Sequence, residues 1–194
     1  PAQSYKNGAL DNTTDTGKTH NGNGNDTATP ENTVVSVGKV TEKENSVQTS
    51  IANAEAETET APSEAQKKAG NYKKGHLKID GFDVTIENPK GSVRSGVDAD
   101  GEKWEQTMNN TYGYIRGTEG VDGDHIDVFL SDNPANGDVF VVDQVNKDGT
   151  FDEHKVMYGF STEEEARNAY LSNYEDGWTG LGAITRVSKE EFKK

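Results

Sequence analysis

The run from residue 126 to residue 157, IDVFLSDNPANGDVFVVDQVNKDGTFDEHKVM, determines which kind of fold the chain can adopt. Within residues 126–130, apolar side chains occupy every second position, and this spacing sends successive side chains to opposite faces of a strand. Residues 139–145 and 151–157 form two further apolar-rich runs on either side of the turn at residues 147–150, which contains an Asp-Gly pair. This arrangement predicts a β-hairpin.

The same sequence pattern continues on both sides of that run, as short segments of alternating apolar and polar residues separated by glycine turns. Further strands are expected at residues 76–80 and 82–87, around a second Asp-Gly turn, and at residues 104–108, 112–116 and 183–187. Ser161-Thr162 followed by three glutamates is typical of a helix start, and we expect a helix of about 12 residues there. A short helix should begin at Ser188. The sequence therefore predicts a mainly β (α+β) domain over residues 70–194.

The part before residue 70 has a different composition. Of the seven tyrosines, six phenylalanines and two tryptophans, only Tyr5 lies in it, and runs such as Asn21-Gly22-Asn23-Gly24 are common. Such a segment cannot bury enough apolar surface to offset chain entropy. We therefore expect residues 1–69 to be a disordered low-complexity tail or linker. Because the chain starts at Pro1, we also expect it to be a segment of a longer polypeptide with further domains.

Bulk properties exclude several classes of protein. The chain has 194 residues, a formal net charge of −14 and no cysteine, which excludes disulfides and thiolate metal sites. No stretch approaches the roughly 18 apolar residues of a membrane span. The acidic balance argues against binding a nucleic-acid backbone. We expect a cytoplasmic protein with no membrane or nucleic-acid partner.

The densest group of chemical side chains is Asp122-Gly123-Asp124-His125-Ile126-Asp127. Convergent carboxylates hold hard divalent cations, and Gly123 permits the bend that would let all three acids converge. The alternative is a solvated acidic loop. An EF-hand is excluded, because its donor spacing and the glutamate at its twelfth position are absent.

Two more clusters accompany this loop. Asp148 lies in the hairpin turn, and Glu153 and Lys155 share one face of the returning strand, where a lysine beside metal-binding acids suits a phosphate substrate. The alternative is an ordinary surface ion pair. Lys90 and Arg94 occupy a glycine-containing loop that could add donors to phosphate.

Together these motifs resemble those of a known family. Tyr112-Gly113-Tyr114-Ile115, followed at the matching spacing by residues 122–128, is similar to the signature of soluble family I inorganic pyrophosphatases. The run from about Gly70 to Phe192 most closely resembles the pyrophosphatase-like domain embedded in large multidomain (polyvalent) proteins of bacteriophages and conjugative elements. We therefore expect a small closed five-stranded OB-like barrel with one or two flanking helices.

The resemblance implies roles for individual residues. The metal ligands, for two or more Mg²⁺ ions, would be Asp122, Asp124, Asp127, Asp148, Glu153 and Glu87. The catalytic groups would be Asp124 as general base, with Lys155, Tyr112 and Arg94. The residues that contact the substrate would be Lys90, Arg94, Lys103, Tyr112, Lys155 and Tyr174, with Lys90 and Arg94 competing for one role.

The expected activity is hydrolysis of inorganic pyrophosphate to two phosphates by metal-activated water. The sequence departs from the family pattern at His125, Glu153 and Met108, and it has no clear counterpart of the family's substrate-binding arginine. One alternative is therefore a weak or inactive module that binds divalent cations or phosphate within a larger mobile-element protein. Another is an acidic mimic of DNA, which predicts charge spread along one surface.

Overall fold

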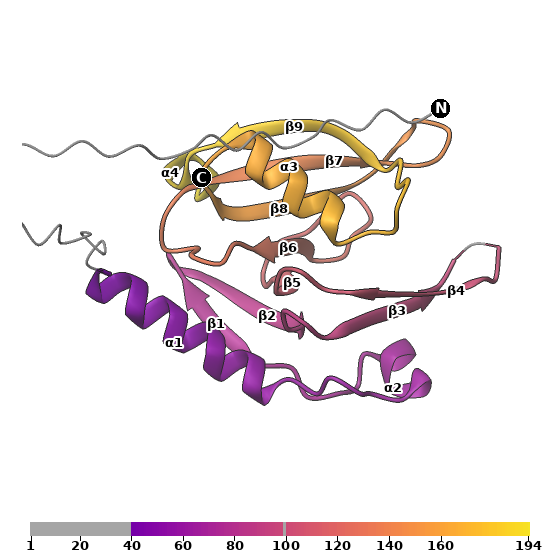
Figure 1. The fold of residues 1–194 in the computed structure, drawn as a ribbon, viewed down its shortest axis with the longest axis horizontal. Helices are drawn as coiled ribbons and strands as arrows, with labels where there is room; N and C mark the ends of the chain where they lie inside the picture. Colours follow the sequence, from indigo (N-terminus) through magenta and orange to yellow (C-terminus); the bar gives the residue numbers. More distant parts are fainter. Residues whose placement is uncertain (1–39, 99) are drawn as a thin grey trace, which may run out of the picture. The chain divides into compact units, whose positions relative to one another are not determined.

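A computed structural model describes residues 40–98 and 100–194. The elements in this part of the chain are drawn in Figure 1. The helices are α1 (Glu42–Glu57), α2 (Glu64–Ala69), α3 (Glu163–Ser172) and α4 (Lys189–Phe192). The strands are β1 (His76–Ile79), β2 (Phe82–Asn88), β3 (Val93–Val97), β4 (Lys103–Thr107), β5 (Tyr112–Ile115), β6 (Ile126–Leu130), β7 (Asp138–Val145), β8 (Phe151–Phe160) and β9 (Leu181–Val187).

Seven of these strands form one sheet in the order β1-β2-β5-β6-β8-β7-β9, and β3 and β4 form a separate two-stranded arm. Neighbouring strands are antiparallel except β6 and β8, which are parallel. The expectation of a mainly β domain is confirmed. The closed five-stranded barrel is not confirmed, because in the described residues the sheet runs from β1 to β9 without those two edge strands pairing. Closure depends on pairing between distant strands, which local alternation does not encode.

The two predicted hairpins are confirmed. Ile79 pairs with Phe82 across the first turn, where Gly81 has a φ of 98°, a conformation that glycine adopts cheaply. The second hairpin joins β7 and β8. The β3 strand was not expected; it pairs along its whole length with β4 and carries Arg94.

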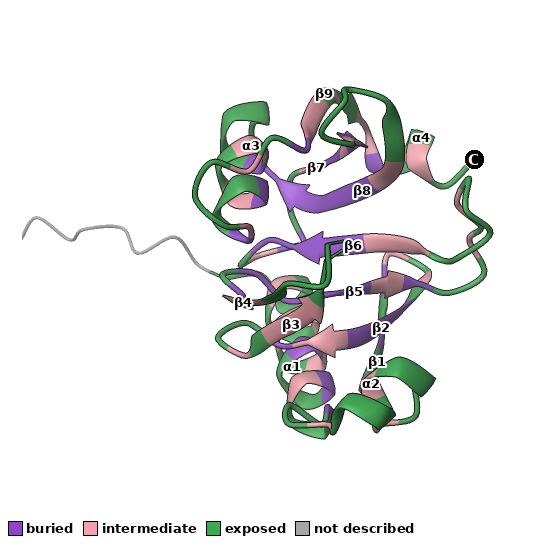
Figure 2. Cartoon of the chain, turned by 90° about the vertical axis from the view of Figure 1, so that its right-hand side faces the viewer, coloured by how far each residue is buried: buried purple, intermediate pink, exposed green. Residues whose placement is uncertain are grey.

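Hydrophobic residues form two clusters that pack on the sheet, and many residues of the strands are buried (Figure 2). Val128 and Leu130 belong to a core that α1 covers, whereas Phe129 belongs to a second core that includes Tyr170 of α3. The predicted alternation along β6 is therefore confirmed. It places Asp127 on the same face as Phe129, toward α3.

Residues 40–69 differ from the expected disordered tail, because they contain α1 and α2. Both helices start with a capping box, at Thr41 and Ser63, which satisfies free backbone N–H groups. Ile51 and Ala54 of α1 are buried against the sheet. Few apolar residues are enough here because the sheet supplies the rest of the contact. The expectation for residues 1–39 lies outside the described residues.

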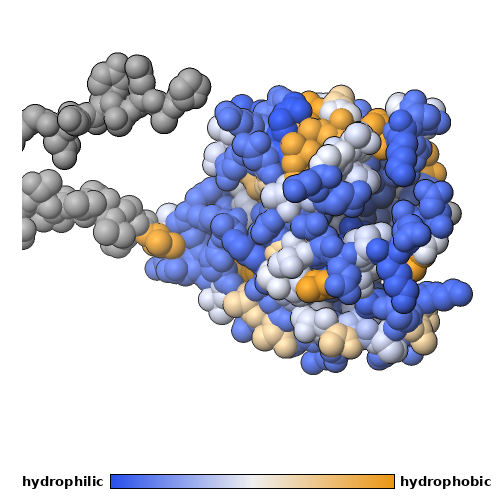
Figure 3. Space-filling model, turned by 45° about the vertical axis from the view of Figure 1, so that its right-hand side comes forward, coloured by the Kyte–Doolittle hydropathy of each residue, from blue (hydrophilic) through white to orange (hydrophobic). Residues whose placement is uncertain are grey.

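The surface visible in Figure 3 is mostly hydrophilic with small hydrophobic areas. Six large apolar side chains are exposed among the described residues: Val40, Val93, Val97, Val121, Phe151 and Leu171. None of the helices in residues 40–98 and 100–194 combines the length and apolar character needed to cross a bilayer.

Candidate active site

Side chains from three neighbouring strands meet on the α3 face of the sheet. Asp127 of β6 is directly opposite Lys155 of β8, and Tyr112 lies on β5, the other neighbour of β6. Residues opposite each other on paired strands point to the same face. The register of the sheet therefore brings these three predicted residues together.

Lys155 is the centre of this cluster, with only 3% of its side chain exposed. Its ammonium group forms ion pairs with Asp127 and, at 2.7 Å, with Glu153. Burial alone would lower the pKa of Lys155, but the carboxylates of Asp127 and Glu153 outweigh it and hold the pKa well above its usual value. Burial raises the pKa of Glu153, against the opposing effect of Lys155. Lys155 is thus a permanent buried cation.

The Tyr112 hydroxyl connects this centre to the β3–β4 arm. It donates a hydrogen bond to Asp127 and accepts one from the Arg94 guanidinium at 3.1 Å. Burial is the main reason that the pKa of Tyr112 is raised, so the hydroxyl keeps its proton. Burial works against the charge of Arg94, but the nearby acids Asp127 and Glu87 outweigh it and raise the pKa of the guanidinium. Lys155 and the Tyr112 hydroxyl therefore contact the Asp127 carboxylate directly, and Arg94 is linked to it through Tyr112.

Aromatic rings hold Arg94 in place. The guanidinium carbon lies 4.3 Å from the centre of the Tyr112 ring and 5.5 Å from that of Trp104 on β4. Trp104 fits closely against β3 because Gly96 has no side chain, and a Cβ atom at that position would lie 2.7 Å from the indole. Trp104 therefore supports the predicted arginine.

Glu87 of β2 lies beside the centre, and its half-buried carboxylate forms an ion pair with Lys74 at 3.6 Å. Burial raises the pKa of Glu87, and the charge of Asp127 adds to the effect. Sequence reasoning missed Lys74. The sequence feature that could have identified it is the adjacent pair Lys73-Lys74 just before β1.

The other predicted acids lie apart from this centre. Asp122 and Asp124 are exposed, and the Asp122 carboxylate accepts a hydrogen bond from the backbone N–H of Asp124, at 3.1 Å. Gly123 has a φ of 85°, so the expected bend is present, but it folds the loop onto itself. Asp148 is exposed in the β7–β8 turn, where its carboxylate accepts hydrogen bonds from Thr150.

The remaining predicted cations also lie elsewhere. Lys90 is exposed and pairs with Asp132 at 2.6 Å, and Lys103 is exposed at the start of β4. Arg94 is thus the member of the Lys90/Arg94 pair that reaches the centre. Tyr174 lies close enough to Lys155 for the charge of the lysine to act on its hydroxyl, whose pKa burial raises to about 12.

Magnesium prefers carboxylate oxygens, and Asp127 and Glu153 supply such donors at the centre. Within residues 40–98 and 100–194, however, no group of three or more acidic or histidine side chains could hold a metal ion. Asp127 and Glu153 are instead ion-paired with Lys155. The donor chemistry suits magnesium, whereas the six predicted ligand acids are not gathered in the part of the chain that the structure describes.

Sequence reasoning also missed Gln144, which is buried on β7 opposite Glu153. Its amide donates to Glu153 at 3.3 Å and accepts from Tyr170 and Tyr174. A signal existed, because Gln144 follows Phe140 and Val142 at every second position and so falls on the core-facing side of the strand.

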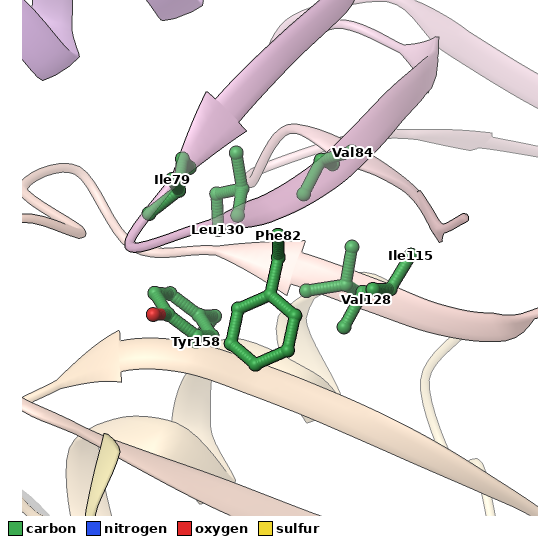
Figure 4. A pocket seen from close by; sticks show the side chains of 7 residues that line it. All are labelled: Ile79, Phe82, Val84, Ile115, Val128, Leu130 and Tyr158. Atoms are coloured by element: carbon green, nitrogen blue, oxygen red, sulfur yellow. The ribbon is translucent and has the colours of Figure 1, made fainter. Parts of the chain in front are cut away.

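A separate apolar pocket lies within the core under the β1–β2 hairpin (Figure 4). It is lined by Ile79, Phe82, Val84, Ile115, Val128, Leu130 and Tyr158. The side chains leave about 0 Å³ for a water-sized molecule, so this pocket is a packing feature of the core and no binding site.

A family model described as inorganic pyrophosphatase matches residues 64–194, about two thirds of the chain. A comparison with curated proteins found no match. The matched region contains the sheet, the β3–β4 arm and every residue of the Asp127–Lys155 centre. The chain therefore belongs to the inorganic pyrophosphatase family.

Proposed function

We propose that the domain hydrolyses inorganic pyrophosphate to two phosphates in a magnesium-dependent reaction with water. The family match supports a phosphoanhydride hydrolase. The observation that carries the proposal is the cluster of Asp127, Lys155, Tyr112 and Arg94, which joins a carboxylate to a buried cation, a partly buried cation and a hydroxyl donor.

These residues suit the demands of phosphoryl transfer. The reaction needs little covalent help from the protein, and catalysis comes from positioning and from neutralising charge on phosphate oxygens. Lys155 is buried and Arg94 is partly buried, and both keep their charge, so they can bind anionic phosphate oxygens. Tyr112 adds a hydrogen-bond donor, and Tyr174 lies nearby as a second one.

Magnesium held by Asp127 and Glu153 would supply positive charge and make water more acidic. The family resemblance adds the loop acids Asp122 and Asp124, with Asp124 as the group that would accept a proton from the attacking water, although both lie apart from the centre in this structure. Glu87 and Asp148 are assigned supporting positions around the same ions.

One alternative has support from a specific observation. Lys155 already pairs with both central carboxylates, and the described acids form no group of three that could hold a metal ion. This arrangement favours a weak or inactive module that binds divalent cations or phosphate, carried by a larger protein of a phage or conjugative element.

Phosphate release from pyrophosphate separates the two functions. We expect turnover with magnesium, inhibition by calcium because its larger and more flexible coordination does not suit the site, and slower reaction with polyphosphate or nucleoside triphosphates. The Asp124→Asn variant keeps the side-chain shape and should lose nearly all turnover. The control Asp83→Asn changes an exposed aspartate of β2 and should keep it. A folded protein without magnesium-dependent turnover would support the binding module, and full activity of Asp124→Asn would remove the assignment of the base.

A further inference from the structure

Gln144 is a buried residue, so the N–H groups and the oxygen of its side-chain amide need hydrogen-bond partners. It lies on β7, opposite Glu153 of β8, and only 6% of the residue is exposed. A carboxamide has two N–H donors and one oxygen that can accept two hydrogen bonds, and leaving such groups unpaired in the interior is costly. The partners of Gln144 therefore determine which way its amide points.

The oxygen of Gln144 faces α3 and the segment that follows it. It accepts hydrogen bonds from the hydroxyls of Tyr170 at 2.7 Å and Tyr174 at 3.0 Å. The indole N–H of Trp178 donates to the Tyr170 hydroxyl at 3.0 Å. Because an indole can only donate, the Tyr170 oxygen accepts there and its own proton is available for Gln144. This direction of donation fixes the amide oxygen toward the tyrosines.

The amide nitrogen therefore faces the acids of β8. It donates to Asp152 at 3.0 Å and to Glu153 at 3.3 Å. The Glu153 oxygen that it contacts is the one that pairs with Lys155 at 2.7 Å. Two donors from different strands thus hold one oxygen of Glu153, and a continuous line of polar contacts joins Trp178 to Lys155.

We propose that Gln144 is a positioning residue of the active site, which orients the Glu153 carboxylate and the Tyr174 hydroxyl toward the Lys155 centre. This role rests on the proposed function, since Glu153 and Tyr174 are assigned there to metal and phosphate. Gln144 has no part in the chemistry itself. Its effect is transmitted through the two side chains that it holds.

The kinetic test uses Gln144→Met, which keeps the length of the side chain and removes its polar groups. We expect kcat/KM for pyrophosphate with magnesium to fall about 10- to 100-fold, as is typical when a partner of a metal ligand is lost. The control Gln48→Met removes an amide that hydrogen-bonds to the Asp132 carbonyl, away from this centre, and should stay within about threefold of the wild type.

A double-mutant cycle with Glu153→Gln separates positioning from a general structural effect. If Gln144 acts through Glu153, Gln144→Met should lower kcat/KM by less than about threefold in the Glu153→Gln background. Equal losses in both backgrounds would overturn the route through Glu153, and a folded Gln144→Met variant with wild-type kinetics would overturn the whole proposal.

A spectroscopic readout keeps the inference testable if the chain does not hydrolyse pyrophosphate. The indole N–H signals of Trp104 and Trp178 can be assigned in ¹H–¹⁵N spectra with a Trp104→Phe variant. We expect Glu153→Gln to shift the Gln144 side-chain amide and the Trp178 indole signals, and the indole shift to disappear when Gln144→Met is added. Unmoved signals in the Glu153→Gln protein would contradict the proposed line of contacts, whatever the activity. An inactive wild-type chain with these shifts would refute only the proposed function.

Discussion

Replacing Lys155 with methionine tests the buried charge cluster most severely. Methionine has a similar length and no charge, so the change leaves the carboxylates of Asp127 and Glu153 facing each other without the ammonium between them. The hydroxyl of Tyr112 is then the remaining donor to Asp127. We expect the variant to fold but to be much less stable than the wild type.

The size of the expected stability loss follows from how deeply the ion pairs of Lys155 are buried. Removing one partner of a buried ion pair costs about 3–5 kcal/mol, because it leaves an uncompensated charge in the interior. Lys155 is 3% exposed, but the side chains of Asp127 and Glu153 are 19% and 28% exposed, so water can partly solvate them. We therefore expect the lower end of the range, about 3 kcal/mol, or roughly a hundredfold in the folding equilibrium.

Urea unfolding at pH 7 measures this loss directly, and the control is Lys78→Met. Lys78 pairs with Asp83 at 2.6 Å, but their side chains are 70% and 52% exposed. Such a surface pair contributes less than about 1 kcal/mol. If Lys155→Met lowered the free energy of unfolding by no more than Lys78→Met does, Lys155 would not stabilise the partly buried carboxylates of Asp127 and Glu153.

Three further outcomes are expected. Arg94→Lys should lower kcat/KM for pyrophosphate tenfold or more, because lysine lacks the planar group that stacks on Tyr112; unchanged steady-state kinetics would contradict this. Burial would raise the pKa of Asp80, but hydrogen bonds outweigh it and lower the pKa to about 2. The carboxylate therefore contributes about 2 kcal/mol to stability above pH 4, and this contribution is lost as the pH falls toward 2. In urea unfolding, the stability of Asp80→Asn should approach that of the wild type over this pH range, and a constant difference would contradict the expectation. Ile51→Ala should cost about 2–4 kcal/mol in urea unfolding, and no loss would mean that α1 is not part of the cooperative unit.

Local sequence signals were sufficient for most of the strands. Period-two alternation and Asp-Gly turns predicted both hairpins, and the capping residues at Ser161-Thr162 predicted α3. The open sheet was not predictable in the same way, since its order depends on which distant strands pair. The α1 helix was missed because its composition is polar, although the capping box at Thr41 and Glu44 was present in the sequence.

The residues of the site also fall into those that local sequence signals predict and those that depend on the fold. Asp127 and Lys155 were found from motifs and strand faces, and their opposite register explains why they meet. The expected convergence of Asp122 with Asp127 failed, because a loop can satisfy its carboxylates with its own backbone. Gln144 carries no motif, and its importance follows from burial and partners that only the fold supplies.

The most direct test of the central claim compares phosphate release from pyrophosphate by the wild-type chain and by Asp127→Asn, with magnesium present and folding checked by circular dichroism. The variant keeps the shape of the side chain and removes the carboxylate that contacts both Lys155 and Tyr112. The account predicts turnover by the wild type and almost none by the variant. A folded wild-type chain that releases no phosphate, or a variant that releases it at the same rate, would contradict the account.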